Sequence, residues 1–449
     1  MSVNKMSKKL LVLSAALTMF MAQAAYAETV HMDLPDAMQR AFDTNPDISI
    51  AQYNFEAARA NYNAARESYG ISITASHQTS RSGYDDPYYN NYGVWTKDIG
   101  NYHSNGVTAS MPIFTGGKLE GATKQAKAAY KIAKVGVQQS YNDMRDTVTT
   151  GYFNVLNARN MRQLTSESVD RLSDHLKNVQ AQYDVGVVAK VDVLRSEVEV
   201  ASAVQSWLSA KNSAEIAEAN LNRIVGLPLD TSLELDDLLN YTPCDYDLPY
   251  CLDYSVKHRP EYEIAKQYVE AAKGALISAK SGHMPQISAS ATQKWADKNW
   301  PGDDNGNWAV GLSASLNVFD TGVTWSKIHA AEADLHKAEE NYRSTVDQLN
   351  LDVRTKYYNM RVAEEQIRSA KSALDAAEED YRIAKLRYMN GVGTNTDVLD
   401  AQVALTNAKT NYLQAMYDYN VSKVELDNAI GVPMVRPVKV VPAKETDKK

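Results

Sequence analysis

An acidic segment follows a glycine-marked turn at residues 391–402, with the sequence Gly-Val-Gly-Thr-Asn-Thr-Asp-Val-Leu-Asp-Ala-Gln. Asp397 and Asp400 are three residues apart, so a helix places both carboxylates on one face. Carboxylates that gather around an opening attract cations and raise one another's pKa. Acids in the first turn of a helix also stabilise the helix macrodipole without any further role. The residues alone leave both interpretations open.

Other spacings that carry chemistry are missing from the sequence. It contains no Gly-rich phosphate loop, no H-E-x-x-H and no nucleophile elbow. Glu332, His336 and Glu340 share a helix face, but acidic and cationic residues at this spacing favour an exposed helix over a metal site. We therefore expect no enzymatic activity, no bound metal and no cofactor.

The glycine turn occurs twice in the chain. Gly186-Val-Val-Ala-Lys-Val-Asp192-Val-Leu194 lies 205 residues before the turn at Gly391. The same offset relates further landmarks without a gap, and a period too long for a solenoid unit indicates that one architecture was built twice. The matched pairs are Phe114 and Phe319, Tyr152 and Tyr357, Tyr183 and Tyr388, Gly226 and Gly431, and Pro228 and Pro433.

The N-terminus has the pattern of a secretory signal peptide at residues 1–27. Three lysines precede an apolar run from Leu10 to about Ala22, and Ala25-Tyr26-Ala27 is a cleavage site. The run is too short for a membrane-spanning anchor, and no later run of 18 or more apolar residues exists. Removal of the three lysines takes the net charge from −8 to −11, which argues against nucleic acid as a partner.

The only two cysteines, Cys244 and Cys251, lie in one loop of this exported chain. An oxidising compartment permits a disulfide between them. Two unpaired, buried thiols are the alternative, and the sequence does not choose between these two states.

Four segments alternate apolar and polar residues, at about 71–80, 105–114, 285–294 and 309–318. Each has about the length of a tilted strand that crosses a bilayer. A soluble sandwich is the alternative, but four strands are too few for one, and the flanking helices offer no wide apolar layer. The loop at 81–104 is rich in tyrosines such as Tyr102, and the loop at 296–306 contains or is flanked by tryptophans such as Trp300 and Trp308. Aromatic residues at strand ends fit an interfacial girdle.

Residues 118–183 and 324–388 have helical patterns without proline. Helices of about 66 residues are on the order of 100 Å long at a rise of 1.5 Å per residue. After each turn a second helix of about 35 residues runs back to a Gly-x-Pro stop at Gly226 or Gly431. The sequence therefore predicts a mainly α protein with a membrane β portion, in which each repeat has two strands and a long helical hairpin.

The expected domains follow from these elements. After the signal peptide come a first structural repeat at 28–230, an inter-repeat connector at 231–251 and a second repeat at 252–434. The polar tail at 435–449 is expected to be disordered.

Together these features resemble the TolC family of outer-membrane efflux proteins, over nearly the whole stretch from Leu34 to Pro433. The most specific marks are the two Gly-x₅-Asp-Val-Leu turns, the Pro-Ile-Phe-x-x-Gly sequence from Pro112 to Gly117, and the Gly-x-Pro stops. The resemblance implies a homotrimer in which four strands per chain close a twelve-stranded β-barrel, continued by a periplasmic α-helical barrel. The edges of a four-stranded sheet cannot stay open in lipid, which agrees with assembly from several copies.

The resemblance also implies roles for residues near the hairpin turns at Gly186 and Gly391. These turns would form the periplasmic entrance, where Asp397 and Asp400 match the positions of aspartate rings. Asp192 and Tyr388 match members of the polar links that hold the entrance closed. The family can carry an arginine at the position of Gly393, so this link must be weaker here or made by another residue, for which Lys190 is the candidate.

The function implied is a passive exit duct of a tripartite efflux or type I secretion system. It would receive substrates from a periplasmic adaptor and an inner-membrane transporter, and outer-membrane lipid would surround its strands. A non-conducting coiled-coil tether between outer membrane and periplasm is the alternative. The alternating strands favour the channel, since a tether needs no polar lumen face. A secreted hydrolase would need a catalytic site, which the sequence lacks.

Overall fold

The computed structural model of the chain describes residues 29–83, 88–89, 95–96, 99–236 and 239–432. The expected signal peptide and C-terminal tail lie outside these residues. The described chain forms two compact units, and each unit draws on both repeats. The first unit holds the residues up to Ser49, Ser140–His258 and the residues from Asn350, and it includes the hairpin ends. The second unit holds Ile50–Gln139 and Arg259–Leu349, and it includes the main sheet.

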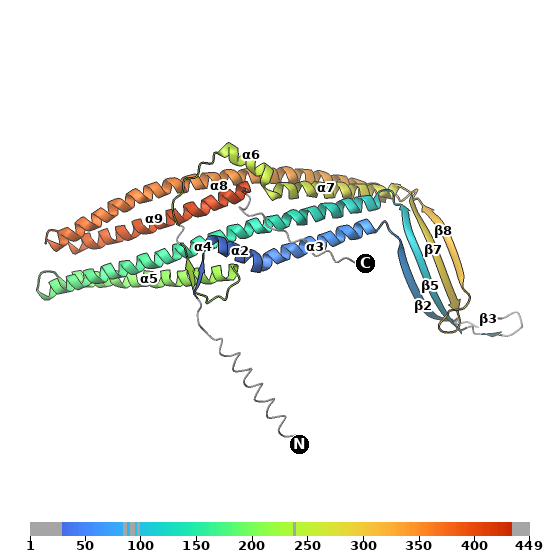
Figure 1. Cartoon of the computed structure of the whole chain (residues 1–449), viewed down its shortest axis with the longest axis horizontal. Helices are drawn as coiled ribbons and strands as arrows, with labels where there is room; N and C mark the ends of the chain where they lie inside the picture. Colours follow the sequence, from blue (N-terminus) through green and yellow to red (C-terminus); the bar gives the residue numbers. More distant parts are fainter. Residues whose placement is uncertain (1–28, 84–87, 90–94, 97–98, 237–238, 433–449) are drawn as a thin grey trace, which may run out of the picture. The chain divides into compact units, whose positions relative to one another are not determined.

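A four-stranded antiparallel sheet belongs to the second unit (Figure 1). β5 (Ile99–Phe114) pairs with β7 (Gln286–Asp297), so the sheet joins the two repeats, while β2 (Ser72–Gly83) and β8 (Asn307–Ser315) are its edges. A separate pairing of β3 (Tyr88–Tyr89) with β4 (Trp95–Thr96) lies in the connection between β2 and β5. In spatial order the main strands are β2, β5, β7 and β8.

Some strand ends differ from the predicted ones because pairing with a neighbouring strand decides where they lie. β2 and β5 extend to Gly83 and Ile99, which pair with each other, instead of ending near 80 and 105. β8 stops at Ser315, opposite the first residue of β7, so the predicted extension to 318 is wrong. Leu316 and Val318 therefore continue the alternating sequence outside the strand.

Cross-strand neighbours point to the same face of a sheet, so the register shows which side chains share a face. The two faces of this sheet differ in polarity. On one face, here called the hydroxyl face, the side-chain oxygens of Thr108 and Thr292 are 3.3 Å apart, and those of Ser288 and Ser313 are 3.0 Å apart. The opposite face, here called the apolar face, is the one that alternation predicts for lipid. From the strand register, it carries Ile73, Ala75, Val107, Ala109, Met111, Phe114, Ile287, Ala289, Ala291, Val310, Leu312 and Ala314.

The aromatic residues expected at the loop side of the sheet are described only in part. Trp300 and Trp308 are exposed, as is Tyr102. Most of the tyrosine-rich part of the 81–104 loop lies outside the described residues.

The two longest helices, α4 (Lys118–Asp184) and α8 (Val323–Met389), have 67 residues each. Their bounds lie within one residue of the predicted ones and are related by the offset of the duplication. Figure 1 shows each beside its return helix, α4 with α5 (Lys190–Ile224) and α8 with α9 (Asn395–Ile430). Within the described residues, no helix combines the length and the apolar character that a membrane crossing requires.

Shorter helices precede the strands of each repeat. α2 (Leu34–Thr44) ends at Asn45, and α3 (Pro46–Glu67) begins at the proline that follows. α7 (Pro260–Lys280) likewise has proline in its first turn, where the missing N–H costs nothing. Pro46 therefore separates α2 from α3, since proline disfavours helix in the residue before it.

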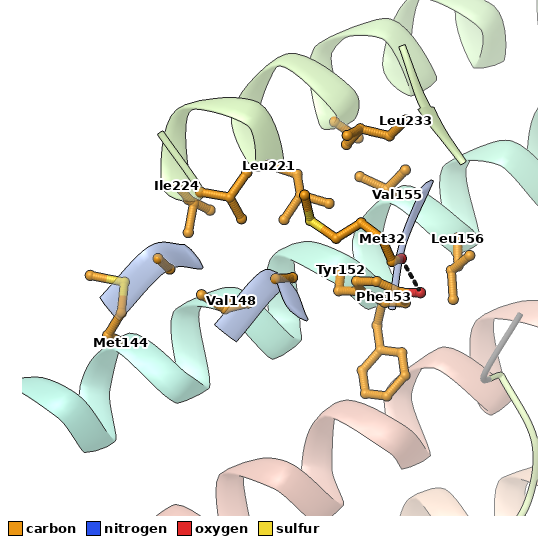
Figure 2. Close-up of a cluster of buried hydrophobic side chains, with 14 of the residues drawn as sticks. Met32, Met144, Val148, Tyr152, Phe153, Val155, Leu156, Leu221, Ile224 and Leu233 are labelled. Carbon is orange, nitrogen blue, oxygen red and sulfur yellow. Dashed lines mark hydrogen bonds between the residues drawn. The ribbon is translucent and has the colours of Figure 1, made fainter. Parts of the chain in front are cut away.

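A hydrophobic cluster in the first unit surrounds Tyr152 of α4 (Figure 2). Its buried hydroxyl donates to the carbonyl oxygens of Met32 at 3.3 Å and Asp236 at 3.0 Å. Burial raises the pKa of this hydroxyl to about 12, so it remains a donor at neutral pH. These contacts hold β1 (Val30–Met32) and β6 (Leu233–Leu235), which pair in parallel and attach the connector to the start of the described chain.

The two cysteines lie in a second hydrophobic cluster of the first unit, with Met360 and Leu426. Both are free and buried, so the structure contains the second of the two states weighed from the sequence. Cys251 belongs to α6 (Leu248–His258), which runs across the boundary expected at residue 251.

Candidate functional site at the hairpin ends

Each hairpin turns at a glycine with left-handed backbone geometry. φ is 76° at Gly186 and 73° at Gly391, and a Cβ at either position would meet no atom within 4 Å. These turns therefore require glycine for its left-handed backbone conformation and not for lack of space, and this conformation costs other residues about 1–2 kcal/mol. Gly393 differs, because its Cβ would lie 3.0 Å from the Cβ of Arg387 and from the backbone nitrogen of Tyr388. Close approach to the end of α8 explains a glycine at this position.

Asp397 caps the start of α9 together with Thr394. The backbone nitrogen of Thr394 donates to the Asp397 carboxylate at 2.9 Å, and the Asp397 nitrogen donates to the Thr394 hydroxyl at 3.1 Å. Hydrogen bonding of the carboxylate to the backbone of Thr394, followed by that to its side chain, lowers the pKa of Asp397. The residue therefore has a helix-starting role, as one of the two interpretations expected. Its side chain is nevertheless exposed, and so is that of Asp400 one turn further on.

A buried polar link joins the two hairpins behind these acids. Nε2 of His175 on α4 lies 2.6 Å from Oδ1 of Asn395 at the start of α9. The Asn395 amide nitrogen donates to the backbone oxygen of Asp192 at 3.1 Å and to the Ser196 hydroxyl at 3.3 Å, both on α5. Because the amide nitrogen of Asn395 is directed at these two oxygens, its Oδ1 faces His175 and can only accept. We therefore assign the donor role in this hydrogen bond to Nε2 of His175. We call His175, Asp192, Ser196 and Asn395 the hairpin link.

His175, Ser196 and Asn395 of the hairpin link are buried and Asp192 is half-buried, and this burial decides the charge of His175. Burial lowers the pKa of His175, against the opposing effect of its hydrogen bond to Asn395, and the charge of Lys385 lowers it further. The imidazole is therefore neutral at pH 7. On the exposed side, Arg195 donates to the Thr396 hydroxyl at 3.0 Å and adds a second contact between α5 and α9.

The residues predicted for the closed-state links are found around the hairpin link, with different contacts. Tyr388 is buried against His175, with ring centroids 5.2 Å apart, and its hydroxyl has no hydrogen-bond partner among the described residues. Burial raises its pKa, followed by the nearby charge of Asp192. Asp192 enters the link through its backbone oxygen. Lys190 is exposed and pairs with no acid in the described part of the chain.

His175, Ser196 and Asn395 are the members that sequence reasoning missed. Ser196 and Asn395 follow their turns by ten and four residues, at positions where the helices are otherwise buried by apolar side chains such as Val193 and Val398. A polar residue on a buried helix face was the available signal, because such groups require partners.

A sheet with one apolar and one hydroxyl-lined face, joined to helical hairpins of this length, is the fold of an outer-membrane channel protein. The chain belongs to the outer membrane efflux protein family, whose model matches residues 37–227 and 253–432.

Individual relatives agree with this assignment. Outer membrane protein TolC of Escherichia coli (strain K12) is 26% identical over 418 residues, which cover 89% of this chain and 82% of that protein. The outer membrane efflux protein BepC of Brucella suis is 22% identical over 442 residues, 96% of this chain and 91% of that protein. Among solved structures, the Campylobacter jejuni CmeC channel has a TM-score of 0.76 at 19% identity and covers 89% of this chain and 85% of its own.

The family settles the class of function. The protein is an outer-membrane exit duct of efflux systems with a long periplasmic helical extension, and it is not an enzyme. The predicted channel, rather than the tether, is confirmed.

Proposed function

We propose that three copies of the chain close one twelve-stranded barrel. The supporting observation is the sheet, which has an apolar face, a hydroxyl face and two edges at β2 and β8. Edge strands expose unpaired N–H and C=O groups, which lipid cannot satisfy. Pairing of β8 in one copy with β2 in the next removes every edge and turns the hydroxyl face toward a water-filled lumen.

We further propose that the hairpin ends form the periplasmic entrance and that the hairpin link holds it closed. The observation that carries this proposal is the position of Asn395, which joins the hairpins two residues before Asp397 and five before Asp400. The exposed carboxylates of three copies would then surround one opening. Such a ring attracts cations and favours their passage or binding. Release of the hairpin link would let the second hairpin move away from the first.

As a member of its family, the chain works in an efflux system with a periplasmic adaptor and an inner-membrane pump. Two relatives from Pseudomonas putida are named as outer-membrane proteins of an antibiotic efflux pump and of a toluene efflux pump. These names support small organic compounds as the exported substrates of this chain, and a type I secretion role stays the alternative.

Native mass measurement of the detergent-purified protein, together with planar-bilayer recording, tests the assembly. We expect the mass of three mature chains and discrete conductance steps. A stable monomer, or a trimer without conductance, would contradict the proposal.

A further inference from the structure

An open groove of about 470 Å³ lies along α4 in the second unit. α3 and α7 supply its sides, and the buried Ala128 of α4 lies at its floor. A second cavity of about 380 Å³ shares Tyr69 and Glu120 with it and continues toward the sheet. All lining residues belong to the second unit, so one compact part of a single chain builds the whole groove.

The end of the groove near the sheet is mostly apolar, with Glu120 and Lys280 as its charged lining residues. Phe114 ends β5 on the apolar face, opposite Ile287. Tyr69, Ile277 and Met284 line the same cavity, and each of these side chains is accessible. An exposed apolar surface that continues the lipid-facing side of the sheet is suited to hydrocarbon chains.

The far end of the groove has a net positive charge, because three lysines line the groove against two glutamates, Glu120 and Glu270. Lys124, Lys127 and Lys131 of α4 line it next to Tyr62 of α3. Lys124 pairs with Glu270 at 3.0 Å, and Lys273 pairs with the same carboxylate at 2.8 Å. Lys127 and Lys131 are exposed and form no ion pair with any other described residue. Their positive charges are therefore available to an anionic ligand.

The basic character is specific to the first repeat. Residues 118–136 contain five lysines and one glutamate, whereas the corresponding residues 323–341 of α8 contain two lysines and four acids. The offset of 205 residues makes the two segments equivalent in the fold, so the helical architecture alone does not require the lysines.

The direction of α4 brings the lysines toward the membrane. The helix begins four residues after β5, and side chains on a helix lean toward its N-terminus. From Lys118, the positions of Lys124 and Lys131 are about 9 and 20 Å along the axis. Lipid headgroups extend about 5–8 Å beyond the hydrocarbon. Lys124 and Lys127 therefore reach the headgroup layer with their long side chains, whereas Lys131 lies beyond that layer but within about one Debye length of it.

We propose that this groove binds an anionic phospholipid of the periplasmic leaflet. Its phosphate would contact Lys124 and Lys127, the charge of Lys131 would attract it from further along α4, and an acyl chain would lie on Tyr69, Phe114, Ile277 and Met284. Such a lipid fixes the depth of the channel in the membrane and the position of α3 and α7 against α4.

The test compares lipid retention by native mass measurement. The full-length mature protein is reconstituted in nanodiscs with equal amounts of phosphatidylglycerol and phosphatidylcholine, then released. We expect preferential retention of phosphatidylglycerol, and a loss of at least about tenfold in that preference in the Lys127→Gln/Lys131→Gln double variant, since each lysine near an anionic surface contributes about fivefold. The Lys127→Arg/Lys131→Arg variant keeps the charge and should keep the preference.

The control removes two exposed lysines from the equivalent part of the second repeat. Lys327→Gln/Lys337→Gln changes the net charge equally and should leave retention unchanged. An equal loss in this control, or no loss in Lys127→Gln/Lys131→Gln, would overturn the proposal. The proposal would also be overturned if millimolar inorganic phosphate abolished the retention of phosphatidylglycerol, because the groove would then be a site for a free anion.

Discussion

His175 and Asn395 are joined by a hydrogen bond of 2.6 Å across 220 residues of sequence, buried between the first and second hairpins. Asn395 uses its remaining groups on Asp192 and Ser196, so one amide side chain contacts both helices of the first hairpin. An unsatisfied buried polar group costs about 1–3 kcal/mol. Each partner in the hairpin link is therefore costly to remove.

The first prediction concerns Asn395→Ala, which removes the centre of the hairpin link. We expect the hairpin ends to lose about 1–3 kcal/mol of local stability, because His175 is left buried without its partner. In planar bilayers the variant should spend more time open than the parent. Asn390→Ala is the control, since exposed Asn390 bonds only to the Leu386 carbonyl among the described residues. Identical conductance of Asn395→Ala and the parent would show that the hairpin link does not hold the channel closed.

The second prediction is that acid weakens the hairpin link. Burial lowers the pKa of His175 from its ordinary value of 6.5, so a released hairpin end binds a proton more readily than the closed one. The contribution of His175 to stability is then complete above about pH 6.5 and falls as the pH drops through that value toward the lowered pKa. Asp397 does not titrate in this window, because the hydrogen bonds from Thr394 lower its pKa below 3.8.

Limited proteolysis of the hairpin ends at pH 7.5 and 5.5 measures this effect. Cleavage should increase at the lower pH in the parent and much less in His175→Gln, whose amide can still donate to Asn395. His336→Gln alters an exposed histidine of the other unit and should behave as the parent. Equal pH dependence in all three proteins would assign the effect to other groups.

The third prediction concerns ion selectivity at the entrance. Asp397→Asn/Asp400→Asn removes both charges at nearly constant shape, and an asparagine at 397 can still accept the hydrogen bond from Thr394. In planar bilayers the double variant should lose most cation selectivity and bind multivalent cations more weakly. Asp253→Asn on α6, remote in sequence from both turns, should retain the parental reversal potential. If the double variant is as selective as the parent, these acids serve only the start of α9.

The fourth prediction is that the two cysteines stay unreactive in the folded protein. Cys251 is completely buried, and burial, followed by the charge of Cys244, raises its pKa to about 11. At pH 8 roughly one thiol in a thousand is then the reactive thiolate. Maleimide should label neither cysteine in the native protein and both after denaturation without reductant. Two unlabelled cysteines after denaturation would mean that the exported protein carries a disulfide.

The fifth prediction contrasts two glycines that have open space around them. Gly391→Ala places a side chain on a residue with φ of 73° and should destabilise the protein by about 1–2 kcal/mol. Gly136 lies inside α4 with nothing within 4 Å of its Cβ position, so Gly136→Ala should stabilise by up to about 1 kcal/mol. The midpoints of chemical denaturation should move in opposite directions. An unchanged or raised midpoint in Gly391→Ala would show that the turn does not require glycine.

The long helices were predicted within one residue at every end because the signals that limit them are local. A left-handed glycine, a proline and a continuous helical pattern act within a few residues of α4 and α8. The alternation of the strands is equally local and correctly separated the apolar face from the hydroxyl face. The glycine turns at Gly186 and Gly391 and the exposure of Asp397 and Asp400 follow from the same short-range rules.

Contacts between distant segments were decided only by the tertiary structure. The end of β8 at Ser315 depends on where β7 begins, and the parallel pairing of β1 with β6 involves strands too short to show a pattern. The state of Cys244 and Cys251 depends on the cluster that buries them. His175 finds Asn395 only because α4 and α9 pack side by side, so the sequence determines the elements and the turns, and the packing of the helices determines which polar groups meet.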